Sequence, residues 1–487
     1  MVDDLNEIKQ KTVSGLFWRF SERICAQIVS FCVTVVLARI LLPDDYGIVA
    51  IVNIFIIIAD SFISSGISAS LIQKKDSDAL DFSTIFYASL GLAFVMYWVL
   101  FFSATFISSI YKNSLLTPIL RIMGIKFFIS AVNSVQQAYV AKKMIFKRFF
   151  FATIIGTIIS AAVGILMALN GFGAWALVAQ SLTNPFIDTI ILFCTVDWFP
   201  EFLFSVQRFR SLFSYGWKVM GANFSGSFFE KLKELVIGTR YLPSDLAFFN
   251  RGESLPLLIT GNITSTIESV LFPVFAKLQG DTEKFKSAVR RSLSFGSYIL
   301  MPLLVGLAVT ADKVVLIIFG KKWLPCVPYL RIICFQDIFI FLNSINLQII
   351  KATGRSDILF ILEFIKKPIM LLIIVFTSMF SPLVICSGLC FYSFIVLFIN
   401  AYPNKRLINY SLIEQFRDVF VNFLEALVMG VFVLVLGVLK LNIYLALCLQ
   451  VFTGFVIYII ISVLFKNPHF SYSLAILRQY KSGGMKK

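Results

Sequence analysis

The sequence is poor in the residues on which enzymes and soluble domains depend. Only 14% of its 487 residues are charged, whereas soluble domains carry about 25%, so there are too few charges to cover the polar surfaces of two or three soluble domains. A single histidine, His469, excludes a zinc site built from histidines and a Ser-His-Asp triad. No Gly-x-x-x-x-Gly-Lys-Ser/Thr phosphate loop is present, which excludes ATP hydrolysis through that motif.

What the sequence has in abundance is apolar residues. Hydrophobic residues make up 58%, phenylalanine alone occurs 53 times, and the mean hydropathy is +0.87. The eight cysteines nearly all lie inside apolar runs, which is typical of reduced packing residues. This composition predicts a polytopic, all-α membrane protein.

Because a spanning helix needs about 20 mostly apolar residues, the chain divides into about 14 candidate transmembrane helices. Lys366, Lys367 and Pro368 interrupt the eleventh candidate, so a count of thirteen stays open. The fourteen segments are 13–40, 46–72, 82–110, 115–140, 149–169, 174–196, 212–239, 246–276, 292–319, 323–350, 357–380, 382–402, 416–439 and 442–465.

The basic residues predict the orientation of these helices. With the N-terminus placed in the cytoplasm, 25 Lys and Arg fall on the cytoplasmic side and six on the outer side, which predicts a multi-pass protein with both termini cytoplasmic. The net charge of +16 therefore reflects contact with anionic membrane lipids, and we expect no nucleic acid as a partner.

A weak internal repeat suggests how the helices are grouped. Leu42-Pro43-Asp44-Asp45 recurs 200 residues later as Leu242-Pro243-Ser244-Asp245. The alternative explanation is that these residue types are simply favourable in turns that end a helix. The repeat predicts an N-terminal six-helix bundle (1–200), a C-terminal six-helix bundle (201–402), and two additional helices with a basic tail (403–487). The loops are too short for a folded domain outside the bilayer.

Ionisable residues inside the spans are the candidate functional residues, because each is costly if it faces lipid. Arg19, Arg23 and Gln27 are four residues apart and form one polar stripe. The cationic candidates for substrate binding are Arg19, Arg23, Lys126, Lys218, Arg251 and Lys366. The candidates for ion coupling are Asp60, Asp337 and Glu363.

Each of these residues also has a structural interpretation, as an interhelical ion pair or as a long side chain that reaches the membrane surface. That alternative is strongest for Arg19, Arg23 and Lys218, which lie near a span end. A cavity with more Lys and Arg than carboxylate favours an anion, and a sugar-linked polyprenyl pyrophosphate is one fitting ligand. We expect neither a metal nor a cofactor.

Two stretches carry a resemblance to a known family. The run Val13–Phe20 followed by Val36–Gly47, and the run Ser65–Lys75 followed by Leu80–Thr84, resemble the opening of bacterial polysaccharide flippases. These form the Wzx-like branch of the multidrug/oligosaccharidyl-lipid/polysaccharide superfamily, and the match is closest to the colanic-acid and teichuronic-acid exporters. It covers about the first 110 residues.

The resemblance implies two bundles with alternating access, located in the bacterial cytoplasmic membrane. It implies export of an undecaprenyl-pyrophosphate-linked oligosaccharide for surface polysaccharide synthesis, with a polysaccharide polymerase and a chain-length regulator as candidate partners. Arg19, Arg23 and Arg251 would then lie in a cationic cavity. A cation-coupled drug antiporter of the same fold is the first alternative, although it predicts a cavity rich in carboxylates.

A membrane glycosyltransferase or polymerase is the second alternative. Such an enzyme needs a catalytic carboxylate on a sizeable loop, and the chain has no such loop, so we expect a transporter and not an enzyme. The sequence leaves the glycan and the energy coupling (proton, sodium or none) open.

Overall fold

The computed structural model describes residues 2–64, 67–74, 76–439 and 441–470, without the side chains of 2–17, 19, 67, 69, 270 and 272. Every regular element in this part of the chain is a helix. Twelve of the described helical segments are long and apolar enough to cross a membrane. The prediction of an all-α, multi-pass membrane protein is therefore confirmed.

The chain forms two compact units, Met1–Ala247 and Phe248–Lys487, called here the N-unit and the C-unit. The predicted grouping into bundles 1–200 and 201–402 with two extra helices stays a prediction. The helices of the N-unit are α1 (Val2–Ile40), α2 (Pro43–Ser64), α3 (Ile67–Gln73), α4 (Ala79–Ile110), α5 (Leu116–Met123), α6 (Lys126–Lys143), α7 (Phe146–Leu169), α8 (Ala174–Thr195) and α9 (Val206–Arg240).

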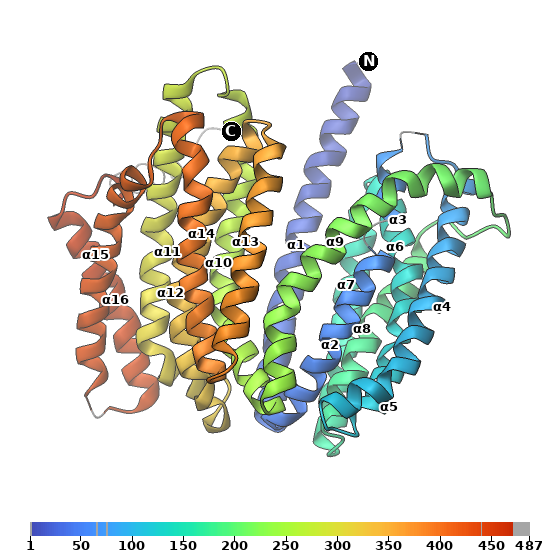
Figure 1. The fold of residues 1–487 in the computed structure, drawn as a ribbon, viewed down its shortest axis with the longest axis horizontal. Coiled ribbons are helices and arrows are strands. Elements are labelled where there is room, and N and C mark those ends of the chain that lie inside the picture. The colour runs from blue at the N-terminus through green and yellow to red at the C-terminus, as the bar shows by residue number, and fades with distance from the viewer. Residues whose placement is uncertain (1, 65–66, 75, 440, 471–487) are drawn as a thin grey trace. The chain divides into compact units, whose positions relative to one another are not determined.

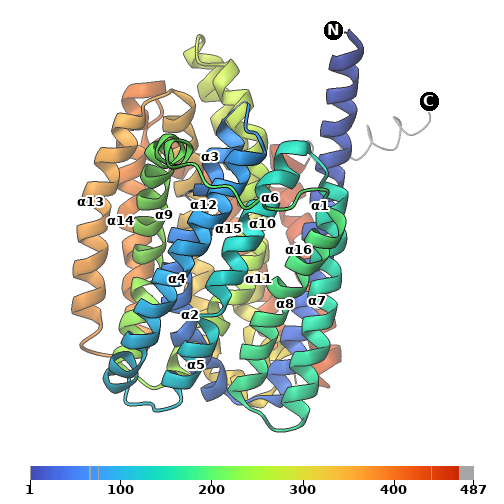
Figure 2. The same ribbon diagram turned by 90° about the vertical axis from the view of Figure 1, so that its right-hand side faces the viewer.

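In the N-unit, α7 and α8 form a hairpin, and α1 packs along α7 (Figure 2). Helix α9 crosses this unit obliquely and packs on α2 and α3 (Figure 1). The chain between α8 and α9 is fixed on the start of α4, because the backbone N–H of Glu201 donates to the Ser83 hydroxyl (3.0 Å) and Trp198 packs against Phe82. This attachment holds the start of α9 beside α4.

Helix α10 (Pro243–Lys277) begins in the N-unit and continues into the C-unit. The other helices of the C-unit are α11 (Thr282–Ile318), the 3-10 helix η1 (Lys321–Cys326), α12 (Val327–Ala352), α13 (Ser356–Thr377), α14 (Pro382–Ile408), α15 (Leu412–Gly437) and α16 (Ile443–Leu464). Helix α11 packs on both α12 and α15, so α15 and α16 form the edge of this unit (Figure 1).

A row of buried amides joins three helices of the C-unit. Asn404 on α14 donates to the Asn346 side chain on α12 (2.7 Å), and Gln415 on α15 exchanges two hydrogen bonds with the same amide (2.9 Å each). Asn400 donates to Asn343 (3.0 Å) one turn further along the same two helices. Hydrogen bonds between side chains are one of the main forces that associate helices in a membrane.

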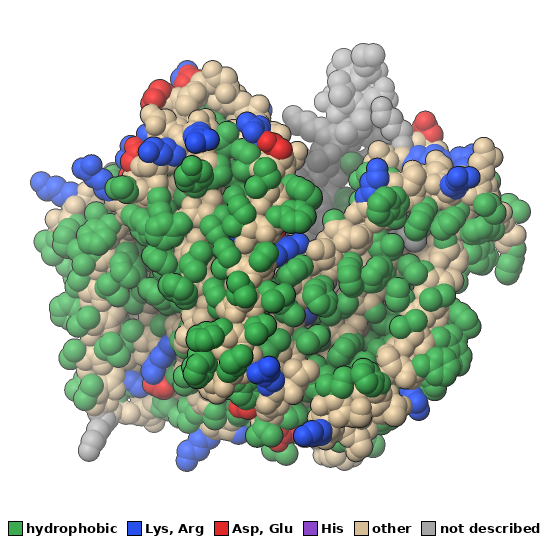
Figure 3. Space-filling view, viewed as in Figure 1, with side chains coloured by type: hydrophobic (Ala, Val, Ile, Leu, Met, Phe, Trp, Pro, Cys, Tyr) green, Lys and Arg blue, Asp and Glu red, His purple; other side chains and the backbone are tan. Residues whose placement is uncertain are grey.

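Basic residues gather at one end of each unit. In the N-unit, Lys74 and Arg208 both pair with the buried Asp81 (2.5 and 3.3 Å), which brings the α3–α4 loop to the start of α9. In the C-unit, Lys286 on α11 binds the Asn409 carbonyl (2.6 Å) in the α14–α15 turn. On the face drawn in Figure 3, hydrophobic side chains cover the sides, and Lys and Arg lie mostly toward the helix ends.

The repeated turn has the same geometry in both copies. In each, the aspartate at the fourth position accepts a hydrogen bond from the backbone N–H of the leucine at the first, Asp45 from Leu42 (3.0 Å) and Asp245 from Leu242 (3.2 Å). Both turns end a long helix at the preceding residues, Ile40 and Arg240, and begin the next helix at a proline. The repeat therefore extends from sequence to local structure.

Two predicted segments each correspond to two observed helices. Segment 46–72 covers α2 and α3, between which residues 65–66 lie outside the described part of the chain, and segment 115–140 covers α5 and α6, with Gly124 ending α5. In contrast, Lys366, Lys367 and Pro368 do not break α13, which is continuous from Ser356 to Thr377. Proline is tolerated inside membrane helices, because neighbouring groups satisfy the backbone carbonyl that it leaves without a donor.

Candidate functional site

A polar pocket of about 400 Å³ lies within the N-unit, between α2, α3, α6 and α8. We call it the N-unit pocket. Its chemistry is unusual for the interior of a membrane protein, because hydroxyls, amides and two carboxyls predominate. The polar side chains that line it are Asp60, Ser64, Ser68, Ser130, Asn133, Ser134, Gln137 and Asp188.

Hydrogen bonds between helices hold the amides of this pocket in place. Asn133 on α6 donates to the hydroxyl of Thr189 on α8 (3.0 Å), and Gln137, one turn along α6, donates to Asn133 (2.5 Å). Ser68 on α3 donates to Ser134 on α6 (3.0 Å). The polar face of α6 is therefore fixed against two neighbouring helices before any ligand enters.

The two carboxyls of the pocket are only partly satisfied. One oxygen of Asp60 and one of Asp188 are buried and have no hydrogen-bond partner among the described residues. Ser130 and Lys126 lie close enough to Asp60 to interact with its carboxyl, and Glu22 of α1 is the charged neighbour of Asp188. Buried polar atoms nearly always have a partner, so these oxygens indicate a site for water, a proton or a small cation.

A glycine makes room for one of these carboxyls. A methyl group on Gly156 of α7 would lie 2.2 Å from an oxygen of Asp188. The close approach of α7 and α8 at this level therefore depends on the absence of a side chain at position 156.

Only some of the predicted residues come together in the N-unit. Lys126, at the start of α6, is the cationic candidate that lies near Asp60. Arg23 on α1 and Lys218 on α9 are exposed and do not line the N-unit pocket. The side chain of Arg19 lies outside the described residues.

In the C-unit, the structure joins two candidates and gives a third aromatic neighbours. Lys366 is buried and pairs with Glu363 one turn earlier on α13 (2.6 Å). Arg251 is buried with its guanidinium carbon 4.8 Å from the ring centres of both Phe319 and Trp323, which is a cation–π arrangement. Asp337 is buried on α12. The binding and coupling roles of these residues stay predictions.

The amides and hydroxyls of α6 were not among the predicted site residues, although the sequence carries a signal for them. Positions 126, 130, 133, 134, 137 and 141 recur at intervals of three and four, which places them on one helical face. Five of these six positions line the pocket. A search for polar stripes, beyond one for charges alone, would have identified this face.

The architecture has a counterpart among solved structures. The lipid II flippase MurJ, in an inward closed conformation, superposes with a TM-score of 0.75 at 14% sequence identity, over 92% of this chain and 98% of MurJ. The fold is therefore that of a polytopic membrane protein of the MurJ type.

The amino-acid sequence identifies the family. Residues 36–328 match the family described as "Polysaccharide biosynthesis protein", and the chain belongs to it. The succinoglycan biosynthesis transport protein ExoT of Rhizobium meliloti (strain 1021) is 25% identical over 72% of this chain and 72% of its own. The lipopolysaccharide biosynthesis protein WzxC of Escherichia coli (strain K12) is 24% identical over 78% of this chain and 76% of its own. The resemblance found in the first 110 residues is confirmed.

Proposed function

We propose that this protein is a flippase that moves an undecaprenyl-pyrophosphate-linked oligosaccharide across the bacterial cytoplasmic membrane by alternating access. The family match, which spans most of the N-unit and residues 248–328 of the C-unit, is the observation that carries the proposal. The relatives ExoT and WzxC bear names from polysaccharide transport and biosynthesis, and the fold is shared with a lipid II flippase. On this proposal the protein is a transporter and not an enzyme.

The proposed topology places both termini in the cytoplasm. The gathering of Lys and Arg at one end of each unit supports this orientation, because positive residues are retained on the cytoplasmic side. The newly exported glycan is then delivered to the outer leaflet, where a polysaccharide polymerase and a chain-length regulator would use it.

The basic and the acidic residues are proposed to have different roles. The cationic candidates are proposed to bind the pyrophosphate, because Lys and Arg are the side chains that bind phosphate oxygens. They are Arg19, Arg23, Lys126, Lys218, Arg251 and Lys366. The N-unit pocket is proposed to bind the coupling ion, a proton or Na⁺, through Asp60 and Asp188. Alternating access requires only that each conformation binds substrate and ion differently.

The substrate is tested by transport of a fluorescent undecaprenyl-pyrophosphate oligosaccharide in proteoliposomes. We expect the Arg19→Ala/Arg23→Ala and Lys366→Ala variants to lose at least tenfold in rate, because each removes a cationic group from the proposed path. Lys321→Ala removes an exposed charge and is the control, with an unchanged rate expected. Efflux of small organic cations, with no lipid transport, would instead favour the antiporter.

The coupling role is tested with the same vesicles under an imposed pH or Na⁺ gradient. We expect the gradient to accelerate transport by the wild type and to have no effect on Asp60→Asn or Asp188→Asn, which would retain only downhill movement of the lipid. Asp312→Asn, in an exposed ion pair with Arg331, is the matched control. Equal dependence of the transport rate on the gradient in all four proteins would mean that the N-unit pocket does not bind the coupling ion.

A further inference from the structure

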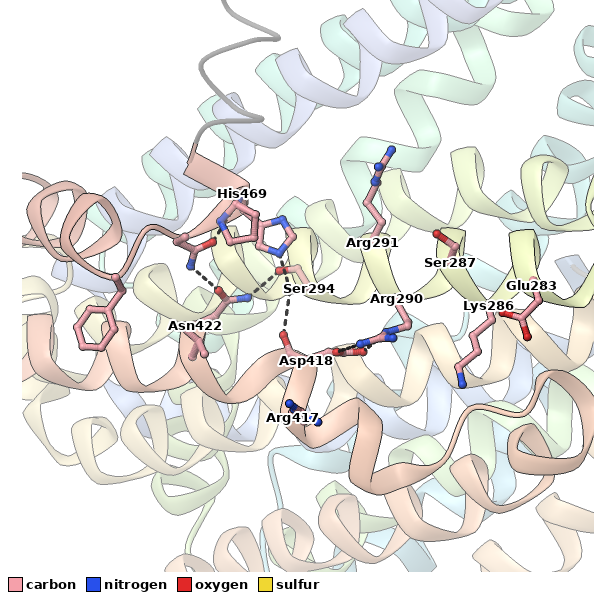
Figure 4. Close-up of a pocket in the computed structure, with 14 residues that line it drawn as sticks. Glu283, Lys286, Ser287, Arg290, Arg291, Ser294, Arg417, Asp418, Asn422 and His469 are labelled. Atoms are coloured by element: carbon pink, nitrogen blue, oxygen red, sulfur yellow. Dashed lines mark hydrogen bonds and ion pairs between the residues drawn. The ribbon is translucent and has the colours of Figure 1, made fainter.

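A second pocket, of about 650 Å³, lies at the end of the C-unit where α11 and α15 begin and the chain leaves α16 (Figure 4). We call it the basic pocket. Four cationic side chains line it against two carboxylates. The charged residues that line it are Lys286, Arg290, Arg291 and Arg417, with Glu283 and Asp418. None of them belongs to the proposed transport path.

Part of this charge is already neutralised within the protein. Arg290 binds both oxygens of Asp418 (2.8 and 2.6 Å), and Tyr410 donates to the same carboxylate (2.8 Å). Lys286 pairs with Glu414, which lies just outside the pocket (2.8 Å). These pairs fix the wall between α11 and α15.

Two further arginines of the pocket are exposed. Arg291 follows Arg290 on α11 and Arg417 precedes Asp418 on α15, and both are exposed. In Figure 4 they extend on either side of the Arg290–Asp418 pair. The pocket therefore presents two guanidinium groups to the solvent, and guanidinium groups are suited to bidentate binding of phosphate oxygens.

The inner wall of the pocket is polar and held in place. Asn422 donates to the Ser294 carbonyl and to the Ser297 hydroxyl (2.8 Å each), while Asn467 donates to Asn422 (2.9 Å). His469 contacts the Ser294 hydroxyl, so the segment after α16 is attached to α11. A preformed wall lowers the entropy lost when a ligand binds.

The same pocket has an apolar flank that continues along the outside of the C-unit. Val421 on α15 and Phe465 at the end of α16 line the pocket, and both are exposed. Beyond them, Leu424 on α15 and Leu464 on α16 are also exposed. A cationic cleft beside a lipid-facing apolar surface matches a ligand with a phosphate at one end and acyl chains at the other.

We propose that the basic pocket binds the headgroup phosphate of an anionic phospholipid from the cytoplasmic leaflet, with its acyl chains along α15 and α16. The choice of leaflet rests on the topology proposed above. The site is separate from the substrate path, so lipid binding and glycan transport are measured independently.

The test is native mass spectrometry of the full-length protein in detergent, titrated with phosphatidylglycerol or with phosphatidylethanolamine. We expect one tightly bound phosphatidylglycerol, with at least tenfold preference over the zwitterionic lipid. Arg291→Gln/Arg417→Gln should lower that affinity about tenfold. Lys405→Gln/Arg406→Gln removes the same charge from two exposed residues outside the pocket, and its affinity should equal that of the wild type.

Three outcomes would overturn the proposal. Equal loss in the two double variants would mean that the lipid responds only to net charge. Equal binding of both lipids would mean that the pocket does not recognise the net negative charge of the headgroup, which phosphatidylethanolamine lacks. Competition by millimolar inorganic phosphate would assign the pocket to a soluble phosphorylated ligand. Gel filtration of each variant establishes that it is folded before any titration.

Discussion

At Gly47, a few residues into α2, the backbone at the start of α10 comes so close that no side chain fits. A methyl group there would lie 1.9 Å from the carbonyl oxygen of Pro243. Because backbone atoms cannot move aside as a flexible side chain can, substitution forces the two repeated turns apart. The small residue is therefore part of how the first and second turns pack within the N-unit.

We expect Gly47→Ala to lower the free energy of unfolding by about 3 kcal/mol, the upper end for overpacked sites. Gly91→Ala is the control, because Gly91 lies inside α4 and a methyl group there meets no atom within 4 Å. Alanine favours helix more than glycine does, so the control should gain up to about 1 kcal/mol. The measurement is unfolding in mixed detergent micelles, and equal effects at the two positions would contradict the packing argument.

His469 makes the attachment of the segment after α16 dependent on pH. Burial lowers the pKa of His469 below its ordinary value of 6.5, and the charge of Arg291 lowers it further. The attached state therefore prefers the neutral imidazole, whereas the detached segment takes up a proton near pH 6.5. Attachment is at full strength above that pH and weakens as the pH falls below it.

We expect hydrogen exchange of residues 465–470 to accelerate at pH 5.5 relative to pH 7.5, after correction for the intrinsic rate. In His469→Gln the corrected rate should no longer change between these pH values, because no titrating group remains at that position. A pH dependence that persists in the variant would assign the effect to another group.

The charged residues of the candidate site were evident from the sequence, but their partners were not. Asp60 and Lys126 are 66 positions apart, and only the packing of α2 on α6 brings them together. Arg251 was predicted from the sequence as a cavity residue, yet it lies against the aromatic rings of Phe319, just after α11, and of Trp323 in η1. Helical periodicity gives the face on which a residue lies, but not which helix covers that face.

Among whole helices, the row of buried amides that joins α12, α14 and α15 is the clearest target for a test. We expect Asn346→Leu to destabilise the protein by about 2 kcal/mol, because it leaves the amides of Asn404 and Gln415 without their partner. Ser387→Ala, at an exposed position of α14, should change stability by less than about 0.5 kcal/mol. Thermal unfolding in detergent distinguishes the two, and an unchanged Asn346→Leu would mean that the amides contribute no net stability.

The existence of each helix could be predicted because apolar runs of about 20 residues are a strong signal. All fourteen predicted segments correspond to helices in the described residues, some of them divided. The end of α5 at Gly124 was missed, since a search for apolar runs of about 20 residues averages over a single turn. Helix α13 was predicted as doubtful because of Pro368, but one lost backbone hydrogen bond does not end a helix that is packed along α14.

For the whole molecule, the topology depends on whether α9 and α13 cross the membrane. Every 18-residue stretch of α13 carries at least three charges, and α9 is rich in polar residues, so neither satisfies the apolarity of the other twelve spans. If both cross, fourteen spans return the chain to the cytoplasm. If either does not, every loop after it lies on the opposite side from the one proposed.

Labelling of single cysteines by an impermeant maleimide in intact cells decides between these cases. With the eight native cysteines replaced, we expect Ser114→Cys to react, and Ser356→Cys and Lys405→Cys to react only after permeabilisation; all three positions are exposed. Ser356 lies after α9, so its reaction in intact cells would mean that α9 does not span. Lys405 is separated from Ser356 by α13 and α14, so its reaction alone would exclude α13 as a span. Protection of both, with Ser114 labelled, supports fourteen crossings and places the basic ends of both units in the cytoplasm.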